Sequence, residues 1–559
     1  MLIAEAVRNR LRVALAAALA DHGVVVDPTD IKIEYPLDLS HGDYASGVAM
    51  KYAKQAGVAP KMLAEQLVTA VGKLDGVQSI EVAGPGFVNI TLTPQEVAST
   101  VGYAASDAWG RNLPTGKHIL FEYTDPNPFK AFHIGHLMSN TIGESLARLT
   151  DFAGTSVSRA NYQGDVGVHV ACAIWGIRKL GIHPDSADEF GTAYAAGASA
   201  YKDDETAKAE IDVINKAIYD RSDPELNALY DTGRKESLAA FEKIYATLGT
   251  KFDRYFFESE TGPVGKEIVL AHPEVFPESD GARVFKGEEH GLHTRVFISG
   301  KGLPTYEAKE IGLEKMKQDE FPASEKFVIV TANEVIDFFR VVKKAMEFVA
   351  PEIAAKLTHI THGLMKLPEG KMSSRTGSVV TGESLLNDLR TAALERATES
   401  RADDKAKLAE QVAVAAIKFQ ILKQSMTKDI IFDRERALSL EGDSGPYIQY
   451  AHARAHQIVD KATETGVVAV VDERAEPNTV TRLVHRFPEV VESAASLMEP
   501  HVVTTYLIEL ASAYNSWYAE VHVLDGTPAA AHKVAVVNAV RNTLKNGLWI
   551  LGIPAPEKM

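Results

Sequence analysis

Two histidines, His133 and His136, lie where a predicted strand gives way to a predicted helix. A helix N-terminus presents free backbone N–H groups and the positive end of the helix dipole, both of which attract phosphate oxygens. The imidazoles add donors there, and Gly135 between them lets a purine ring or a phosphate approach the backbone closely. This pattern predicts a site for a nucleoside triphosphate. Because the motif is short, histidines that only cap a core helix are the alternative interpretation.

A second group of polar residues follows much later, between Gly370 and Gly377. The glycines predict a mobile loop, and Lys371 with the hydroxyls of Ser373 and Ser374 can reach phosphates on which charge builds up during displacement. A solvated surface lysine is the alternative interpretation of this loop.

The elements that must position both groups are those of an α/β region. Residues 118–123 form an apolar run, typical of a buried parallel strand, and an apolar helical stripe starts near Ile134. Strands and helices then alternate through residues 112–384, which predicts a Rossmann-like, doubly wound parallel sheet. The expected strands are 118–123, 156–161, 283–285, 294–298 and 327–330, and residues 182–252 are expected to form a helical insertion.

Two further regions flank the predicted sheet and make the chain an α/β multidomain protein. Residues 1–111 are expected to form an α+β module, with a strand at 30–35, a polar turn at 41–46 and paired strands at 80–82 and 87–92. Residues 385–559 show helical periodicity almost throughout and predict an all-α bundle.

Composition restricts the class of protein and its location. The 559 residues contain 45% hydrophobic residues and a single cysteine, Cys172, which excludes an intramolecular disulfide and a Cys-rich zinc site. No apolar run approaches the ~20 residues of a membrane span, and the apolar N-terminus has helical spacing rather than the pattern of a signal peptide. We therefore expect a cytoplasmic protein without membrane contact.

The net charge of −16 provides no overall attraction to nucleic acid. Any such partner would have to bind at local basic and aromatic patches.

Taken together, the two motifs resemble the paired HIGH and KMSKS signatures of class I aminoacyl-tRNA synthetases. The first is complete, as His133-Ile134-Gly135-His136, whereas the second reads Lys371-Met372-Ser373-Ser374-Arg375 and lacks the usual second lysine. Most arginyl-tRNA synthetases lack this lysine. Residues 441–454, EGDSGPYIQYAHAR, and 551–559, LGIPAPEKM, are also similar to that family, so the resemblance covers nearly the whole chain.

The resemblance implies an arginine–tRNA ligase that acts as a monomer. Its substrates would be ATP with Mg²⁺, L-arginine and tRNA(Arg), and it would transfer the arginyl group to the 2′-OH of the terminal adenosine. The catalytic residues carried over from the family are His133, His136, Lys130 and Lys371, and those assigned to ATP binding are Gly135, Met372, Ser373, Ser374 and Arg375.

Arginine recognition requires carboxylates, because a guanidinium pairs with them in a bidentate geometry. The resemblance assigns this site to Glu122, Asn127, His133, Tyr306, Glu310, Glu334 and Asp165. Glu310 stands where the family usually has aspartate, and Glu334 and Asp337 stand where it commonly has glutamine and histidine. Asp165 fits a turn-forming role equally well.

The helical region and the N-terminal module are implied to bind tRNA. The module resembles the domain that approaches the tRNA elbow, and aromatic residues near basic ones can stack on anticodon-loop bases. The residues assigned to this contact are Tyr447, Tyr450, Arg454, Trp517 and Met559. Burial in the helical core is the competing account, and for Trp517 it is the favoured one.

Three other functions remain open from the sequence. A class I synthetase for another amino acid would share both motifs. A small-molecule nucleotidyltransferase would share His-x-Gly-His but would not need the flanking regions. A catalytically silent paralogue could bind tRNA alone, although intact His133, His136 and Lys371 argue against it.

Overall fold

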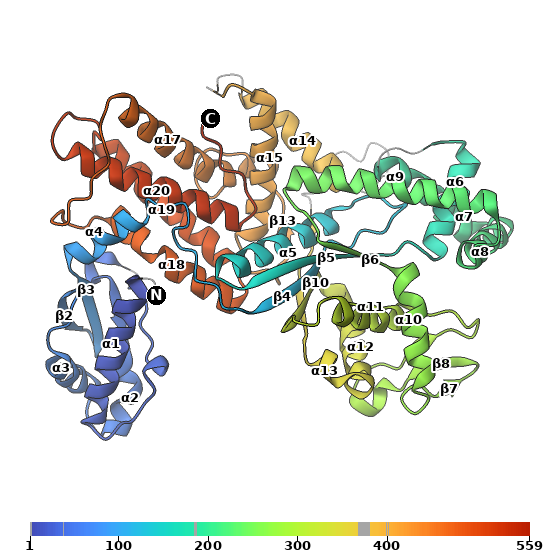
Figure 1. Cartoon of the computed structure of the whole chain (residues 1–559), viewed down its shortest axis with the longest axis horizontal. Helices are drawn as coiled ribbons and strands as arrows, with labels where there is room; N and C mark the ends of the chain where they lie inside the picture. The colour runs from blue at the N-terminus through green and yellow to red at the C-terminus, as the bar shows by residue number, and fades with distance from the viewer. Residues whose placement is uncertain (1–2, 37, 184–186, 367–380, 398–399, 401) are drawn as a thin grey trace.

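Five parallel strands form the central sheet, in the spatial order β11-β10-β4-β5-β6 (Figure 1). The structure is a computed structural model that describes every residue except 1–2, 37, 184–186, 367–380, 398–399 and 401. The strands are β4 (His118–Tyr123), β5 (Ser156–Gln163), β6 (Arg254–Phe257), β10 (Lys326–Ala332) and β11 (Leu357–His362). The predicted doubly wound parallel sheet is confirmed.

Alternate residues of the strands enter two separate cores, one on each face of the sheet. Phe121 and Val328 pack with α5 (Ile134–Phe152) on one face. Leu120 and Phe327 point the other way. The helices over that second face are α10 (Glu258–Ala271), α11 (Tyr306–Glu320), α12 (Ile336–Val349) and the short α13 (Pro351–Ala354). The sheet is therefore covered on both sides, as its continuous apolar strands require.

Part of the strand prediction was wrong. Strands β8 (Ala282–Phe285) and β9 (Arg295–Ile298) do not join the parallel sheet but form an antiparallel one with β7 (Glu278–Ser279). Only residues 286–294 connect β8 to β9, which is too short for the crossover that a parallel pair needs. Strands β6 and β11 were not predicted.

The segment between β5 and β6 forms helices α6 (Val168–Leu180), α7 (Ala187–Asp203), α8 (Glu205–Asp220) and α9 (Pro224–Leu248). Helices α6, α7 and α8 lie at the far end of the molecule from the last C-terminal helices, and α9 extends from them toward the middle of the molecule (Figure 1). They share a core of their own, in which Phe129, Cys172, Phe190 and Ile211 are buried. Asp204 and Asp223 cap α8 and α9 by accepting hydrogen bonds from first-turn N–H groups.

The N-terminal module packs three main helices against a three-stranded sheet. Its elements are α1 (Ile3–Ala20), β1 (Tyr44–Ser46), α2 (Val48–Ala56), α3 (Pro60–Val71), β2 (Val77–Ala83) and β3 (Phe87–Leu92), followed by α4 (Pro94–Tyr103). The pair β2 and β3 is as predicted. The strand predicted at 30–35 is wrong: only Glu34 bridges to Ala45, and the strand forms instead within the predicted polar turn.

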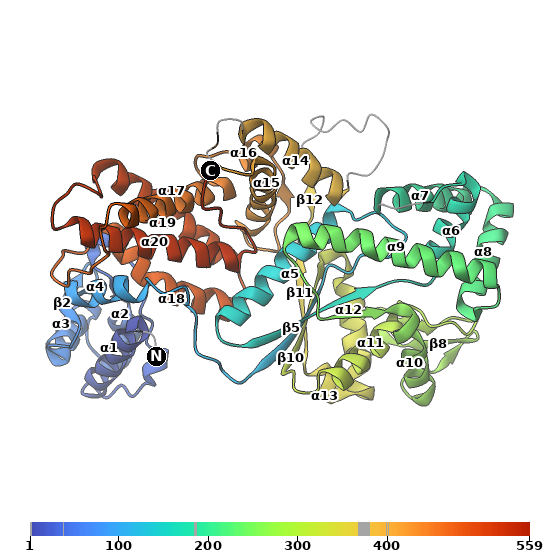
Figure 2. The same cartoon turned by 45° about the horizontal axis from the view of Figure 1, so that its top comes forward.

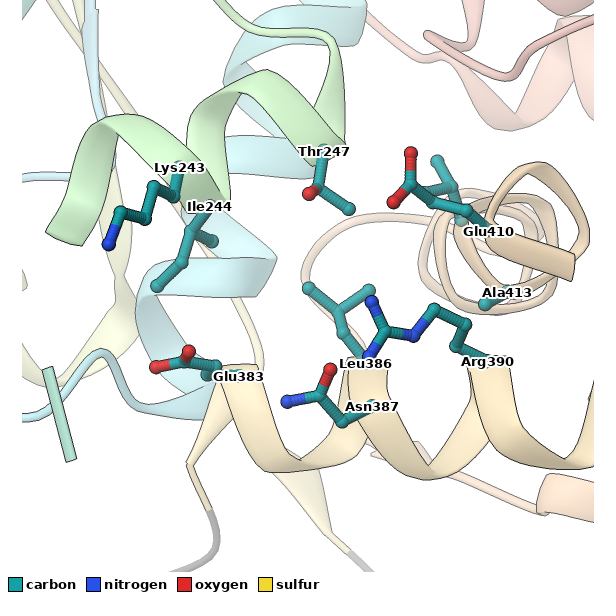
Figure 3. A pocket seen from close by; sticks show the side chains of 10 residues that line it. Lys243, Ile244, Thr247, Glu383, Leu386, Asn387, Arg390, Glu410 and Ala413 are labelled. Atoms are coloured by element: carbon teal, nitrogen blue, oxygen red, sulfur yellow. The ribbon is translucent and has the colours of Figure 1, made fainter. Parts of the chain in front are cut away.

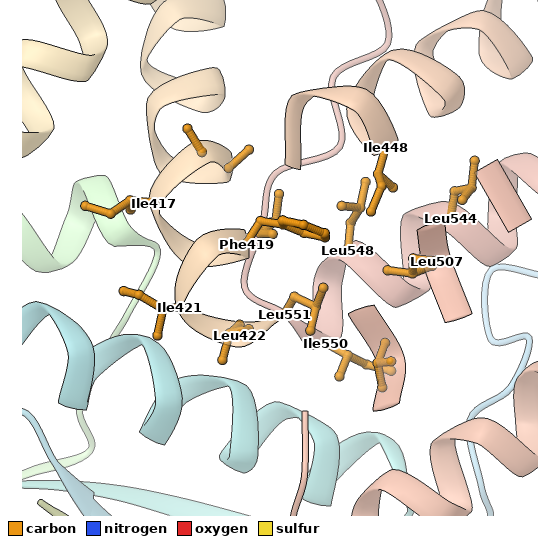
Figure 4. Packing of buried hydrophobic residues seen from close by; sticks show 14 of the residues in the cluster. Ile417, Phe419, Ile421, Leu422, Ile448, Leu507, Leu544, Leu548, Ile550 and Leu551 are labelled. Carbon is orange, nitrogen blue, oxygen red and sulfur yellow. The ribbon is translucent and has the colours of Figure 1, made fainter. Parts of the chain in front are cut away.

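The C-terminal region is helical, as predicted. It comprises α14 (Gly382–Arg396), α15 (Lys405–Leu422), α16 (Arg434–Ala437), α17 (Gly445–Glu464), α18 (Thr479–Leu497), α19 (His501–Glu520) and α20 (Ala530–Ile550). Its short strand β13 (Ile430–Ile431) pairs with β12 (Met365–Lys366), which follows β11 in the chain. Phe419, Leu507 and Leu548 meet in its core (Figure 4). None of the described helices is both long enough and apolar enough to cross a membrane.

The end of α20 lies on α5, the helix that begins at the histidine motif (Figure 2). Ser145 Oγ donates to the carbonyl oxygen of Ile550 at 3.1 Å, and Arg148 Nη1 donates to that of Trp549 at 3.2 Å. Arg148 also pairs with Glu144 on its own helix at 2.7 Å. The helical bundle and α5 therefore share a polar junction, in which last-turn carbonyls of α20 find donors.

A second junction joins the N-terminal module to α18. Glu489 on α18 is buried and accepts hydrogen bonds from the hydroxyls of Tyr35 and Tyr44, and it pairs with Arg8 at 3.3 Å. Arg482 Nη1 donates to Asp43 at 2.6 Å beside it. The module is thus held by buried ionic and hydrogen-bonded contacts.

Glu489→Ala is expected to lower the free energy of unfolding of the module by about 3 kcal/mol, because two buried hydroxyls lose their carboxylate acceptor and Arg8 loses the buried one of its two carboxylate partners. Calorimetry would show an earlier transition for the module. The matched control is Glu492→Ala, whose carboxylate also pairs with Arg8 but is 48% exposed. We expect less than about 1 kcal/mol for that control, and equal effects of the two changes would contradict the prediction.

Candidate active site

The two motif histidines cap helix α5 by a reciprocal pair of hydrogen bonds. The backbone N–H of His136 donates to Nδ1 of His133 at 3.3 Å, and the backbone N–H of His133 donates to Nδ1 of His136 at 3.2 Å. The two rings stack with centroids 3.5 Å apart. Because both Nδ1 atoms accept, the proton of each neutral imidazole must lie on Nε2.

Both histidines are held in the neutral form. Burial lowers the pKa of His136 well below its usual value, and the adjacent His133 and Lys130 lower it further. The pKa of His133 is also lowered, by desolvation and by Lys130. At neutral pH the helix start therefore presents two Nε2–H donors without adding a positive charge that would need a permanent counterion.

The turn between β4 and α5 is strained. Thr124 has φ +86° and Asp125 has φ +47°, a region that β-branched residues rarely adopt. Ser139 Oγ accepts a hydrogen bond from the backbone N–H of Thr124 at 3.0 Å, and Asn140 donates to its hydroxyl at 3.0 Å. Helix α5 thus holds the turn that precedes it, and such strain is common at functional sites.

A cavity of about 550 Å³ opens between the carboxyl ends of β4 and β10. Chain order reverses between these two neighbouring strands, and ligands bind at such switch points in open α/β sheets. The cavity brings together seven of the predicted site residues: Glu122, His133, Gly135, His136, Tyr306, Glu310 and Glu334. The predicted phosphate-binding donors and the acidic residues therefore face one space.

The wall formed by α11 is strongly acidic. Glu310 is 5% exposed, and its Oε1 has no hydrogen-bond partner among the described residues. Burial and the neighbouring Glu122 raise its pKa well above the usual range. A buried carboxylate without a partner is costly, and a cationic substrate would supply the missing partner. Tyr306, 61% exposed, lies at the mouth of the cavity.

Three predicted site residues do not line the cavity. Asp165 accepts hydrogen bonds from Arg234 at 2.9 Å and from the hydroxyl of Ser259 at 2.7 Å, so it ties α9 and α10 together. Asn127 Oδ1 accepts from the backbone N–H of Gly164 at 3.1 Å and fixes the turn after β5. The ammonium of Lys130 lies 4.8 Å from the centre of the Tyr194 ring.

The second motif lies outside the described residues. It contains Lys371, Met372, Ser373, Ser374 and Arg375. The last strand of the parallel sheet before it, β11, ends at His362, which lines the cavity, and the two-residue strand β12 follows. The chain therefore leaves the sheet for this segment at the same edge on which the histidine motif lies.

A smaller pocket of about 150 Å³ lies elsewhere, between α9, α14 and α15 (Figure 3). Lys243 and Arg390 line it together with Glu383 and Glu410. It contains none of the predicted site residues, and its mixed charges select neither an anion nor a cation.

Comparison with known families identifies the chain. Residues 103–434 match the sequence model of the family described as tRNA synthetases class I (R), catalytic domain. Residues 6–92 match the arginyl tRNA synthetase N terminal domain, and residues 448–559 match the DALR anticodon binding domain. The chain belongs to the arginyl-tRNA synthetase family.

Individual relatives agree over the full length. The chain is 30% identical to the arginine–tRNA ligase of Clostridium beijerinckii, an alignment that covers 94% of this chain and 96% of the relative. It is 29% identical to that of Clostridium perfringens, with the same coverage. The solved structure of Thermus thermophilus arginyl-tRNA synthetase superposes with a TM-score of 0.83, at 26% identity over 99% of this chain and 100% of that one.

Within the family's C-terminal domain, the structure gathers some of the residues predicted to bind tRNA. Arg454 lies over the rings of Tyr450 and Tyr518, at 4.7 and 5.3 Å from their centres. Tyr447 and Trp517 are instead partly buried against the helical core. The C-terminal tail that ends in Met559 runs beside α17, where Gln449 and His452 hydrogen-bond to the carbonyl oxygens of Pro554 and Pro556.

The sequence reasoning missed several residues of this family member's pocket. Behind the pocket, Glu314 and Lys317 are both buried and continue the charged stripe of α11 from Glu310. Their spacing of i, i+4 and i+7 on a predicted helix was the available signal, because charges in the stripe that faces a core are uncommon. Asp125, Arg295 and His362 were missed because no motif includes them.

Proposed function

We propose that the protein is an arginine–tRNA ligase. It activates L-arginine with ATP to arginyl-adenylate and pyrophosphate, and then transfers the arginyl group to the 2′-OH of the terminal adenosine of tRNA(Arg). The observation that carries this proposal is the cavity at the switch point, where neutral histidine donors and the buried, unpaired carboxyl group of Glu310 share one space. An anionic nucleotide and a cationic amino acid would each find complementary groups there.

In the first step an oxygen of the arginine carboxylate attacks the α-phosphorus, and the bond to the leaving pyrophosphate breaks. The Nε2–H groups of His133 and His136 donate to phosphate oxygens on which charge develops. Lys130 and Lys371 are assigned to stabilising the same developing charge. The segment from Met372 to Arg375 is assigned to binding ATP. Glu122, Tyr306, Glu310 and Glu334 hold the cationic substrate.

Mg²⁺ is proposed to arrive with ATP, because Mg²⁺ is usually bound through substrate phosphates and few protein carboxylates. The described residues contain no group of three His, Cys, Asp or Glu side chains arranged to hold a metal ion. Phosphate oxygens and water would therefore provide most of its ligands.

The test is arginine-dependent exchange of pyrophosphate into ATP, measured with and without tRNA(Arg) and with lysine as a control amino acid. We expect exchange with arginine but not with lysine, and only when tRNA is present. Exchange with another amino acid would instead identify a different synthetase. Tight ATP binding without exchange under any condition would identify a silent paralogue.

tRNA is proposed to lie along the N-terminal module and the C-terminal helices. The module would contact the tRNA elbow. Tyr450 and Arg454 would contact the anticodon loop, with Tyr447, Trp517 and Met559 nearby. The protein is proposed to act as a cytoplasmic monomer, which light scattering of the purified chain would test.

Arg454→Met is expected to raise the KM for tRNA about tenfold, because the change removes a cation that supports two aromatic rings and can pair with phosphate. Aminoacylation at varied tRNA concentration measures this, and the KM for arginine should not change. Lys461→Met, an exposed charge loss on the same helix, is the control. If the KM for tRNA is the same in the two variants, Arg454 is not part of the proposed tRNA contact.

A further inference from the structure

Lys317 places an ammonium group beneath the acidic wall of the cavity. Its side chain is completely buried, and Nζ lies 2.5 Å from Glu122 Oε2 and 2.5 Å from Glu314 Oε1. Both carboxylates are also buried, at 3% and 1% exposure. A buried ion pair of this kind is weak support for stability alone, because desolvation opposes the attraction.

Two other cations near the cavity, Lys309 and Arg295, each pair with one carboxylate. Lys309 pairs with Glu258 at 2.6 Å, and Arg295 pairs with Glu307 at 3.0 Å. Lys317 is different, because it is shared by two carboxylates and lies near others.

Around Lys317 the carboxylates outnumber the cations. Glu122, Glu310 and Glu314 surround it, with Asp125 close by, and no other cation is among the groups that shift the pKa values of Glu310 and Glu314. Glu310 Oε1 and Glu314 Oε2 have no hydrogen-bond partner among the described residues. The cluster is therefore short of positive charge, and arginine would bring a guanidinium and an ammonium group.

The pKa shifts of Glu314 and Lys317 agree with a cluster that has one permanent cation among several carboxyl groups. Burial raises the pKa of Glu314 to about 7, with Lys317 acting in the opposite direction. Burial lowers the pKa of Lys317, but Glu122, Glu314 and Glu310 together raise it above its usual value, so Lys317 stays charged. Lys317 thus remains a fixed cation, while the carboxylates around it adjust their protonation.

We infer that Lys317 is a positioning residue of the arginine site. Lys317 contacts one carboxylate oxygen of Glu122, so that the other oxygen is left for the substrate. It also balances the charge of Glu314, so that Glu310 is the carboxylate left to pair with the cationic substrate. Lys317 itself does not touch the substrate. The inference rests on the proposed function and adds to it the residue that sets the charge and geometry of the amino-acid site.

The first test is Lys317→Met in the full-length protein, assayed by arginine-dependent pyrophosphate exchange in the presence of tRNA. We expect the KM for arginine to rise at least tenfold, with the KM for ATP within twofold of the unaltered protein. Lys315→Met is the matched control, because this half-exposed lysine on the same helix pairs with the surface residue Asp319. Its KM values for arginine and for ATP should equal those of the unaltered protein.

A second variant separates positioning from charge balance. Lys317→Met combined with Glu314→Gln removes one charge of each sign, so it should fold even where the single variant does not. We expect this double variant to keep the raised KM for arginine, because Glu122 still lacks its support. A return to the unaltered KM would overturn the inference, as would an unchanged KM in a folded single variant.

These outcomes are distinguishable from failure of the proposed function. If the unaltered protein shows no exchange with arginine, the proposed function is overturned and the inference with it. If the unaltered protein is active and only the variants behave otherwise than expected, the inference alone is overturned.

Discussion

Replacing His133 by asparagine is expected to lower kcat for arginine-dependent pyrophosphate exchange by about 100-fold, with little change in stability. Asparagine is among the best N-cap residues, so the start of α5 should survive the change. The Nε2–H donor is lost, and removal of one such donor from a charge-stabilising site costs about 10²- to 10³-fold in kcat. Steady-state exchange kinetics and thermal unfolding measure the two effects.

This variant decides between the two interpretations of the histidine pair. The structure shows that His133 does cap α5, so a role in folding alone would predict that asparagine preserves activity. His133→Ala is the matched comparison, because it removes the cap as well as the donor and should lose about 1 kcal/mol of stability in addition. Full activity in His133→Asn would reduce His133 to a capping residue.

Glu310→Gln is expected to raise the KM for arginine by about 30-fold or more. Loss of a carboxylate that pairs with a buried cation typically costs 2–5 kcal/mol, or about 30- to 5,000-fold. The KM for ATP should stay nearly constant, since no phosphate donor is altered. Kinetics at varied arginine concentration provide the measurement.

Glu310→Asp is the control that distinguishes the effect of charge from the effect of side-chain length. It keeps the charge and withdraws the carboxylate by one methylene, so we expect a change of less than about tenfold. An equally large effect of both variants would mean that geometry rather than charge dominates. An unchanged KM in Glu310→Gln would exclude Glu310 from arginine recognition.

The raised pKa of Glu310 adds a pH dependence to the same site. Protonation removes the charge that pairs with the substrate, so the KM for arginine should increase as pH falls through this raised pKa. In Glu310→Gln this part of the pH profile should be absent. An identical profile in the two proteins would assign the pH dependence to another group.

Local sequence signals were sufficient for the part of the site built by adjacent residues. The strand ending at Tyr123 and the helix starting at Ile134 were predicted correctly, because the apolar run, the prolines and the helical stripe all lie within one short segment. The position of His133 at a helix start followed from these neighbours.

Contacts between distant segments were beyond the sequence signals. Strand β11 was missed because His359 and His362 interrupt its apolar pattern; His359 is accommodated by a hydrogen bond with Thr331 on β10. Asp165 lies in a recognisable turn, but its partners Arg234 and Ser259 are far away in sequence. Burial of Lys317 likewise depends on Glu122, nearly 200 positions earlier. Such pairings are set by tertiary packing, which periodicity does not encode.

The junction between α5 and the end of α20 has a consequence for how the protein is made. Ser145 and Arg148 bond to carbonyl groups 405 and 401 positions later in the chain. At about 5–20 residues per second, a ribosome needs roughly 20–80 seconds to cover that distance. During this time the helix that carries the histidine motif has emerged without its final support. The polar contacts of α5 are therefore complete only after the last helix has been synthesised.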